Sequence, residues 1–186
     1  MTSLQQDVGG RGTDPAKTIA EHVVDVPDFP QPGVVFKDLT PLLADGPAFA
    51  ETIRAIVEHH GADSFDVVAG IEARGFMLAA AVAYATGVGM VPIRKAGKLP
   101  RQAHAATYEL EYGQATLEVH VDAFMAGQRV LVVDDVLATG GTAAATLGLV
   151  EQAGGVVAGF SVVLELSFLG GRERLAPHTV HALLTV

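Results

Sequence analysis

The chain carries the sequence VLVVDDVLATGGT at residues 130–142, and this stretch decides its fold class. The apolar start, residues 130–133, is typical of a strand buried on both faces, as in a parallel α/β sheet. A loop of small residues follows, and the Ala-rich segment 143–152 then predicts a helix that ends at Gly154. The stretch therefore predicts strand, loop and helix in succession, which is the repeating unit of an α/β protein.

The same stretch carries groups that suit a sugar phosphate. Ligands of open α/β sheets bind beyond the carboxyl ends of the strands, where a helix N-terminus offers unpaired N–H groups to a phosphate. Asp134 and Asp135 close the strand and, when ionised, only accept hydrogen bonds, which suits the hydroxyls of a ribose. We therefore predict a ribose 5-phosphate site, with the phosphate in the loop of Ala138, Thr139, Gly140, Gly141 and Thr142.

Other motifs with paired acids or glycines fit less well. A two-component receiver domain has paired acids near its first strand and needs about 100 further residues, whereas 51 residues follow Asp135 here. The chain lacks the Gly-x-x-x-x-Gly-Lys-Ser/Thr run of a P-loop, and no Gly-x-Gly-x-x-Gly follows a strand. Two acids at a strand end fit a solvated sheet edge as well as a site, so the Thr-Gly-Gly-Thr continuation is what favours phosphate binding.

Composition bounds the remaining possibilities. The chain has 186 residues, 49% of them hydrophobic, which is the size of one domain, expected at residues 13–186. Residues 1–12 are polar and lack the apolar core of a signal peptide, so we expect a disordered extension and a cytoplasmic protein. The absence of cysteine excludes a disulfide framework and a thiol nucleophile.

Residues 73–108 form a cationic zone in a chain with a formal charge of −9, because this window contains no Asp or Glu. Basic loops often only solvate a surface, but this zone flanks the strand ends of a fold predicted to bind phosphate. Nucleic-acid binders usually show a basic domain or stripe, often with stacking aromatics, so we expect a small polyanion and no nucleic acid. The basic residues of the window are Arg74, Arg94, Lys95, Lys98 and Arg101.

The remaining patterns predict an α/β fold with a mostly parallel sheet flanked by helices. Glycines and a proline divide the uncharged residues 75–93 into a buried helix, 76–86, and a strand, 88–93, so a membrane span is not expected. Residues 107–121 alternate around Gly113, which predicts an antiparallel hairpin. Further strands are expected at 65–71, 130–134 and 156–164, a loop at 29–38, and helices at 15–24, with Asp14 as N-cap, and at 47–60.

Five further motifs extend the argument beyond residues 130–142. The chain resembles the type I phosphoribosyltransferases, and among them the branch that acts on adenine, from about residue 29 to residue 177. The motifs that carry the resemblance are FPQPGVVFKD at 29–38, GIEARGF at 70–76, IRKAGKLP at 93–100, YELEYG at 108–113, and LEL at 164–166 with GRE at 171–173.

The resemblance implies Mg²⁺-dependent transfer of the 5-phosphoribosyl group from phosphoribosyl pyrophosphate (PRPP) to N9 of adenine. The products are AMP and pyrophosphate, the pathway is purine salvage, and the assembly is a homodimer. Mg²⁺ keeps several waters and lies mainly on PRPP oxygens, so no metal site made by the protein alone is expected. Arg74 and its loop are implied to hold pyrophosphate, helped within one subunit or across a dimer interface by Arg94, Lys95 and Lys98.

The resemblance also implies how the base is chosen. Relatives that act on 6-oxopurines usually place an acidic residue where this chain has Ala138. That side chain acts as acid or base toward N7 of the purine. Proton transfer is therefore expected from Glu111 with Tyr112, on a hairpin that closes as a flap and excludes water. The alternative is that Glu111 is an ordinary exposed strand residue, as is usual for a glutamate in an alternating hairpin.

For the adenine ring, the resemblance points to the motif at residues 29–38. Backbone groups of Val35 and Lys37 are expected to meet the edge of the base. Its faces are expected to contact Phe36 on one side and Val136 or Leu137 on the other. Phe36 equally fits ordinary core packing, which the sequence alone, without the resemblance, would favour.

Two other functions stay open. A non-catalytic PRPP-sensing regulator would keep residues 134–142, but it need not keep Arg74 or Glu111 and would usually add a basic DNA-binding segment. An enzyme for another purine or a pyrimidine would differ only in the base pocket. The histidines do not predict a metal centre, because His59 and His60 are adjacent on a helix and point in different directions.

Overall fold

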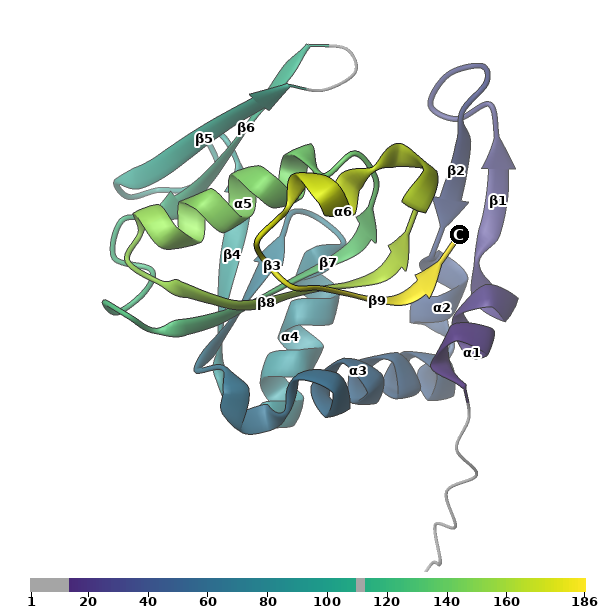
Figure 1. Cartoon of the computed structure of the whole chain (residues 1–186), viewed down its shortest axis with the longest axis horizontal. Helices are drawn as coiled ribbons and strands as arrows, with labels where there is room; N and C mark the ends of the chain where they lie inside the picture. Colours follow the sequence, from purple (N-terminus) through teal and green to yellow (C-terminus); the bar gives the residue numbers. More distant parts are fainter. Residues whose placement is uncertain (1–13, 110–112) are drawn as a thin grey trace, which may run out of the picture.

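The computed structural model describes residues 14–109 and 113–186, most of which belong to a seven-stranded sheet and its flanking helices (Figure 1). The helices are α1 (Pro15–His22), α2 (Thr40–Ala44), α3 (Gly46–His60), α4 (Gly75–Thr86), α5 (Gly141–Gln152) and α6 (Gly171–Arg174). The strands are β1 (Val24–Pro27), β2 (Val35–Asp38), β3 (Val67–Ile71), β4 (Gly89–Lys95), β5 (Ala103–Glu109), β6 (Gln114–His120), β7 (Arg129–Leu137), β8 (Val156–Glu165) and β9 (Val180–Thr185).

The large sheet has the strand order β5-β6-β4-β3-β7-β8-β9. The central strands β4, β3, β7, β8 and β9 are parallel, and β5 and β6 join them as an antiparallel hairpin. The predicted α/β fold with a mostly parallel sheet is therefore confirmed. The chain leaves β3 toward β4 on one side and β7 toward β8 on the other, so a topological switch point, where such folds bind ligands, lies between β3 and β7.

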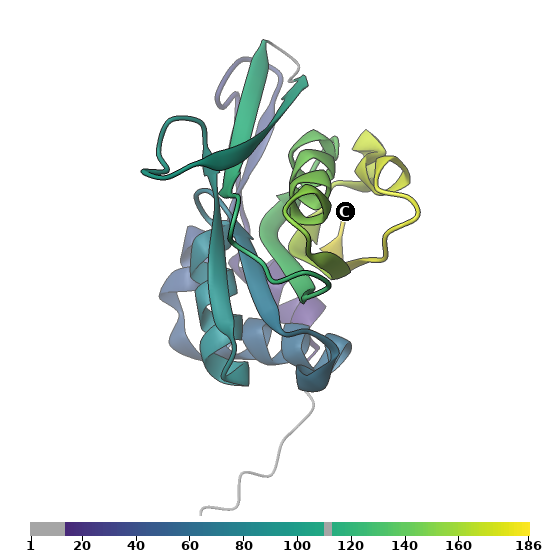
Figure 2. The ribbon, with the colours of Figure 1, turned by 90° about the vertical axis from the view of Figure 1, so that its left-hand side faces the viewer.

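Helices cover the two faces of the sheet unequally, as Figure 2 shows edge-on. Strand alternation sends Leu131 and Val133 of β7 to one face, where α1 to α4 bury them, while Val130 and Val132 pack toward α5 on the other face. All four valine and leucine side chains are fully buried. The run at residues 130–133 is therefore buried on both faces, as its sequence predicts.

Local signals placed several elements correctly. Asp14 caps α1 by accepting a hydrogen bond from Ala16 N at 3.1 Å, and α3 ends at Gly61. The hairpin is antiparallel around Gly113, although its strands begin at Ala103, before the predicted start. Among the described residues, no helix has the length and apolar character needed to cross a membrane.

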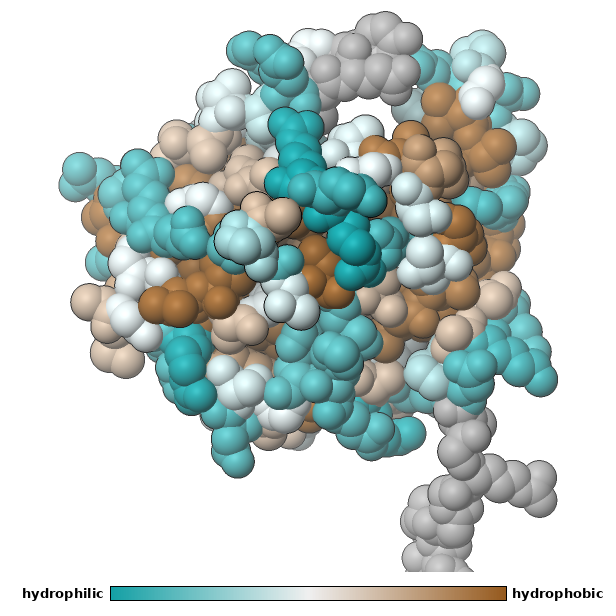
Figure 3. Space-filling model, in the orientation of Figure 1, coloured by the Kyte–Doolittle hydropathy of each residue, from teal (hydrophilic) through white to brown (hydrophobic). Residues whose placement is uncertain are grey.

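Two expectations were wrong in detail. The first helix ends at His22, not at residue 24, because Val24 and Val26 pair with residues of β2 in a separate two-stranded sheet. For the same reason the loop expected at 29–38 is partly strand. Exposed apolar side chains, including Phe29 and Val35, give this sheet a hydrophobic surface, visible on the right of Figure 3. Strand β9, at the edge of the large sheet, was not foreseen.

Candidate active site

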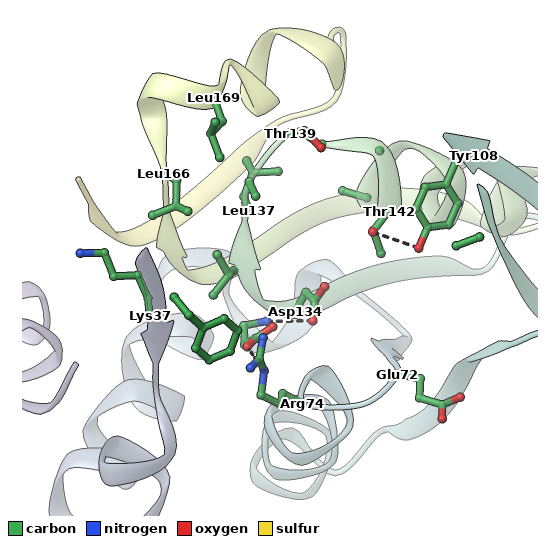
Figure 4. Close-up of a pocket in the computed structure, with 18 of the residues that line it drawn as sticks. Lys37, Glu72, Arg74, Tyr108, Asp134, Leu137, Thr139, Thr142, Leu166 and Leu169 are labelled. Atoms are coloured by element: carbon green, nitrogen blue, oxygen red, sulfur yellow. Dashed lines mark hydrogen bonds and ion pairs between the residues drawn. The ribbon is translucent and has the colours of Figure 1, made fainter. Parts of the chain in front are cut away.

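A cavity of about 670 Å³ opens at the carboxyl ends of β3 and β7, at the switch point of the sheet (Figure 4). Segments far apart in the sequence meet there: β2, the β3–α4 loop, β7 with the loop before α5, the hairpin, and the segment after β8. The lining includes most of the predicted residues, namely Val35, Phe36, Lys37, Arg74, Lys95, Asp134, Asp135, Val136, Leu137, Ala138, Thr139, Gly140, Gly141 and Thr142.

The loop between β7 and α5 leads into a helix that starts with two glycines, Gly140 as N-cap and Gly141 as the first helical residue. Gly140 adopts a φ of 80°, which glycine tolerates best, and α5 begins at Gly141. The N-cap residue Gly140 has no side chain, so the first N–H groups of α5 lack the partners that an N-cap side chain would supply. Free N–H groups and the positive end of the helix dipole favour an anion at this end of the cavity.

Two adjacent carboxylates lie at the end of β7, and Arg74 approaches them from the β3–α4 loop (Figure 4). Arg74 Nε forms an ion pair with Asp135 Oδ2, yet this buried oxygen accepts no hydrogen bond from any described residue. Burial, together with the charge of Asp135, raises the pKa of Asp134 well above its usual value. The pair therefore combines a carboxyl group that resists ionisation with an oxygen that can accept a ligand hydroxyl.

The β3–α4 loop approaches β7 closely because α4 begins with a glycine. A Cβ atom on Gly75 would lie 2.9 Å from both Asp134 Oδ1 and Val133 O. A larger residue would therefore push Arg74 and its loop away from the carboxylates. The peptide bond between Glu72 and Ala73 in this loop is cis.

Glu72 contacts three residues of the cationic zone, a role that the sequence did not predict. Its carboxylate is paired with Lys98 Nζ, lies 3.4 Å from Arg94 Nε and accepts a hydrogen bond from Lys95 N at 3.0 Å. The hydrogen bond from Lys98 is the main reason why the pKa of Glu72 is lowered. Arg94 and Lys98 are thus held by Glu72 and are not among the residues that line the cavity, whereas Lys95 is.

On β2, Phe36 is flanked by aromatic and cationic groups. Arg74 Cζ lies 5.0 Å from the centroid of the Phe36 ring, and the edge of Phe29 meets the ring at 5.2 Å between centroids. Lys37 turns its ammonium toward Asp25, at 2.7 Å, so the side chain is occupied and only its backbone is available to a ligand. Phe36 is half-buried at the cavity wall and is not part of the buried hydrophobic core.

The hairpin contacts, through Tyr108, the loop at residues 138–142, which is called the phosphate loop after its predicted ligand. Thr142 Oγ1 donates a hydrogen bond to Tyr108 Oη at 3.1 Å (Figure 4). The predicted proton-transfer residues, Glu111 and Tyr112, lie outside the described residues. Tyr108 begins the YELEYG motif, but the alternation of the hairpin alone does not show which of its side chains reaches the loop.

The segment after β8 adds apolar lining that the sequence did not predict. Leu166 and the 41%-exposed Leu169 both face the cavity. Leu137, one of the two residues proposed for the base, is only 1% exposed and packs mainly in the core, whereas Val136 keeps more surface. The signal for Leu166 was the LEL motif, but its position at the cavity depends on the pairing of β8 with β7.

Comparisons with known proteins agree with this geometry. The family model for the phosphoribosyl transferase domain matches residues 41–177. Adenine phosphoribosyltransferase of Salinispora arenicola is 72% identical over 96% of this chain and 95% of its own.

Solved structures give the same result. The crystal structure of adenine phosphoribosyltransferase from Thermoanaerobacter pseudethanolicus superposes with a TM-score of 0.89 at 45% identity, covering 92% of this chain and 99% of its own. The Saccharomyces cerevisiae enzyme, complexed with adenine and an imino-altritol bisphosphate, reaches a TM-score of 0.86 at 40% identity over 91% of this chain and 98% of its own. The chain therefore belongs to the adenine phosphoribosyltransferases, within the type I phosphoribosyltransferase family.

Proposed function

We propose that this chain transfers the 5-phosphoribosyl group of PRPP to N9 of adenine, with Mg²⁺, in cytoplasmic purine salvage. In the reaction N9 bonds to C1′ of the ribose, the bond from C1′ to the pyrophosphate oxygen breaks, and adenine loses one proton. The products are AMP and pyrophosphate. The observation that carries the proposal is the uncapped start of α5 beside Asp134 and Asp135 in one cavity.

The 5-phosphate is assigned to the loop of Ala138, Thr139, Gly140, Gly141 and Thr142. Its first helical N–H groups supply donors without a competing side chain. Thr142 would exchange its bond with Tyr108 for one with a phosphate oxygen. The ribose hydroxyls are assigned to the acids, because Asp135 Oδ2, although paired with Arg74, is buried and accepts no hydrogen bond from the part of the chain that the structure describes.

Pyrophosphate is assigned to Arg74 and Lys95, which line the cavity. Arg94 and Lys98, which are paired with Glu72, add positive charge nearby. The carboxylates in the cavity lining are those of Asp134, Asp135 and Glu72, and Glu72 is already engaged by three cationic-zone residues. This donor set suits Mg²⁺ carried on PRPP oxygens and water rather than in a cage of protein ligands. When bound, the ion neutralises charge on the leaving pyrophosphate.

Adenine is assigned to the edge of β2. Pro27 faces Val35 in the β1–β2 register and has no N–H, so the ladder bonds belong to the alternate pair, Val26 with Phe36. The backbone N–H and C=O groups of Val35 and Lys37 then point away from β1, toward the open edge of β2. They can match the amino donor and N1 acceptor of adenine, while Phe36 and Val136 contact its faces.

The side chain of Ala138 cannot exchange a proton with the base. Proton transfer is therefore assigned to Glu111 with Tyr112 on the hairpin. The hairpin projects beyond the body of the protein, as Figures 1 and 2 show, and Tyr108 already contacts the phosphate loop. A hairpin that closes over bound substrates would exclude water and so protect PRPP from hydrolysis.

We also propose a homodimer that uses the outer face of α4. This helix carries no charged residue, and Tyr84 is 92% exposed while Met77 is 47% exposed. An exposed apolar helix face of this kind is typical of a subunit contact. Sedimentation of the wild type and of Tyr84→Glu tests this point, with the variant expected to dissociate.

A panel assay tests the proposed reaction. The chain is supplied with PRPP, Mg²⁺ and one of adenine, hypoxanthine, guanine, xanthine, orotate or uracil, and nucleotide and pyrophosphate are measured. AMP from adenine alone is the expected result. Turnover of a 6-oxopurine would overturn the base assignment, and tight PRPP binding without turnover would favour a regulator.

A further inference from the structure

Three histidines from distant parts of the sequence form a cluster outside the cavity. His59 and His60 end α3, and His181 lies in β9. The ring of His181 stacks on His59 with centroids 3.5 Å apart and planes 4° apart, and it meets the edge of His60 at 5.6 Å. One ligating nitrogen from each residue lies within 4.8 Å of the other two. His59 and His60 were expected to point in different directions because they are adjacent on a helix. Their rings nevertheless lie close together, with centroids 4.9 Å apart.

The cluster has nitrogen lone pairs that nothing in the described chain uses. His60 Nε2 is buried and has no hydrogen-bond partner among the described residues. His181 Nδ1 lies 3.1 Å from the hydroxyl of Ser161, which is fully buried. When Nδ1–H donates to Ser161, Nε2 of His181 is left as a lone-pair ligand, an arrangement typical of histidines at metal sites.

The end of α3 and a glycine of β8 shape the surroundings of the cluster. The last turn of α3 carries the negative end of the helix dipole. A Cβ atom on residue 159 would lie 2.8 Å from Cε1 of His60, so glycine at this position admits the ring.

We propose that His59, His60 and His181 bind one borderline divalent transition-metal ion of the Zn²⁺ class, with water completing the coordination. Zn²⁺ binds imidazole nitrogen at about 2.0–2.1 Å, so the three nitrogens must draw closer together. His59 is exposed at the helix end and can leave its stack on His181 to do so. None of the three residues lines the cavity, so the ion would join α3 to β9 and would stabilise the fold without taking part in phosphoribosyl transfer.

Metal binding by the untagged full-length chain tests this inference. After removal of metal by a chelator, titration calorimetry with ZnCl₂ should give one ion per chain, and Zn²⁺ should raise the thermal unfolding temperature. Co²⁺ in place of Zn²⁺ should give the visible absorption of a histidine-ligated site. His59→Ala and His181→Ala should each weaken Zn²⁺ binding at least tenfold.

His178→Ala is the matched control, because His178 lies near β9 but pairs with Glu151 at 3.7 Å and is not part of the cluster. This variant should bind Zn²⁺ like the wild type. His59 is exposed, so its substitution leaves the core intact and the result can be read even if the His181 variant unfolds. Absence of Zn²⁺ binding by the wild type, or unchanged binding by His59→Ala, would overturn the proposal.

Discussion

Gly140 of the phosphate loop lies directly against Gly171 at the start of α6, so closely that a Cβ atom on Gly140 would be 2.6 Å from Gly171 O. A Cβ atom on Gly171 would in turn collide with Ala138 O. The partners are backbone atoms, which cannot turn aside as a flexible side chain can. Two segments about thirty residues apart therefore share one tightly packed wall, and the shape of the proposed phosphate site depends on it.

Replacing Gly171 with alanine should displace the phosphate loop. We expect the KM for PRPP to rise about tenfold or more, since a misplacement of about 1 Å can have effects of that size or larger. Steady-state kinetics with varied PRPP measure this change. Gly148→Ala is the control, because Gly148 is exposed on α5 with open space around it.

The control variant should keep the wild-type KM and gain about 1 kcal/mol of unfolding free energy, because alanine is the better helix former. An unchanged KM in Gly171→Ala would show that the loop does not need its contact with α6.

Arg172 fixes the position of α6 through a buried partner. Its Nε donates to Glu165 Oε1 at 2.9 Å and its Nη1 to Val180 O at 2.7 Å, while the Glu165 side chain is only 5% exposed. Arg172→Gln would leave this carboxylate without its charged partner, so we expect a loss of about 2 kcal/mol in unfolding free energy. Urea denaturation measures it, with the exposed Arg54→Gln as control.

Kinetics can distinguish the substrate-binding role proposed for Asp135 from the proton-transfer role proposed for Glu111. Asp135→Ala should weaken PRPP binding, because it removes the acceptor assigned to the ribose hydroxyls. Glu111→Ala should lose much of kcat while PRPP binding survives, because proton transfer matters only in the chemical step. Equal loss of PRPP affinity and kcat in both variants would contradict this division.

Acid should weaken one specific ion pair. Arg129 donates to Asp66 from Nη2 at 2.6 Å and from Nε, and these hydrogen bonds lower the pKa of Asp66 to about 2. A free aspartate titrates near about 3.9. The pair therefore stabilises the fold above about pH 4, and its contribution disappears as the pH falls toward about 2.

Urea denaturation at several pH values measures this effect. The difference in unfolding free energy between the wild type and Asp66→Asn should be present at pH 6 and should shrink below pH 4. Asp63→Asn is the control, since Asp63 meets Arg129 through its backbone carbonyl. A difference that does not change with pH would show that packing, not charge, explains the effect of Asp66→Asn.

Local sequence patterns were enough for the elements that carry the proposed sugar-phosphate site. The apolar run of β7, the acids at its end and the glycines before α5 are contiguous, so their arrangement follows from backbone preferences and alternation. The N-cap at Asp14 and the hairpin turn at Gly113 are local in the same sense. Element ends were less certain, as Val24 shows, because pairing with β2 overrides the helical tendency there.

Contacts between distant residues were decided only by the tertiary structure. The sheet order brings Glu72 to the basic residues 94–98, seats Gly171 on the phosphate loop and joins His181 to the end of α3. Each of these contacts depends on which strands become neighbours and in which register. The sequence by itself therefore determined the chemistry available to this protein, whereas packing across the sheet decided which charged and polar groups meet, because such contacts leave no periodic signal along the chain.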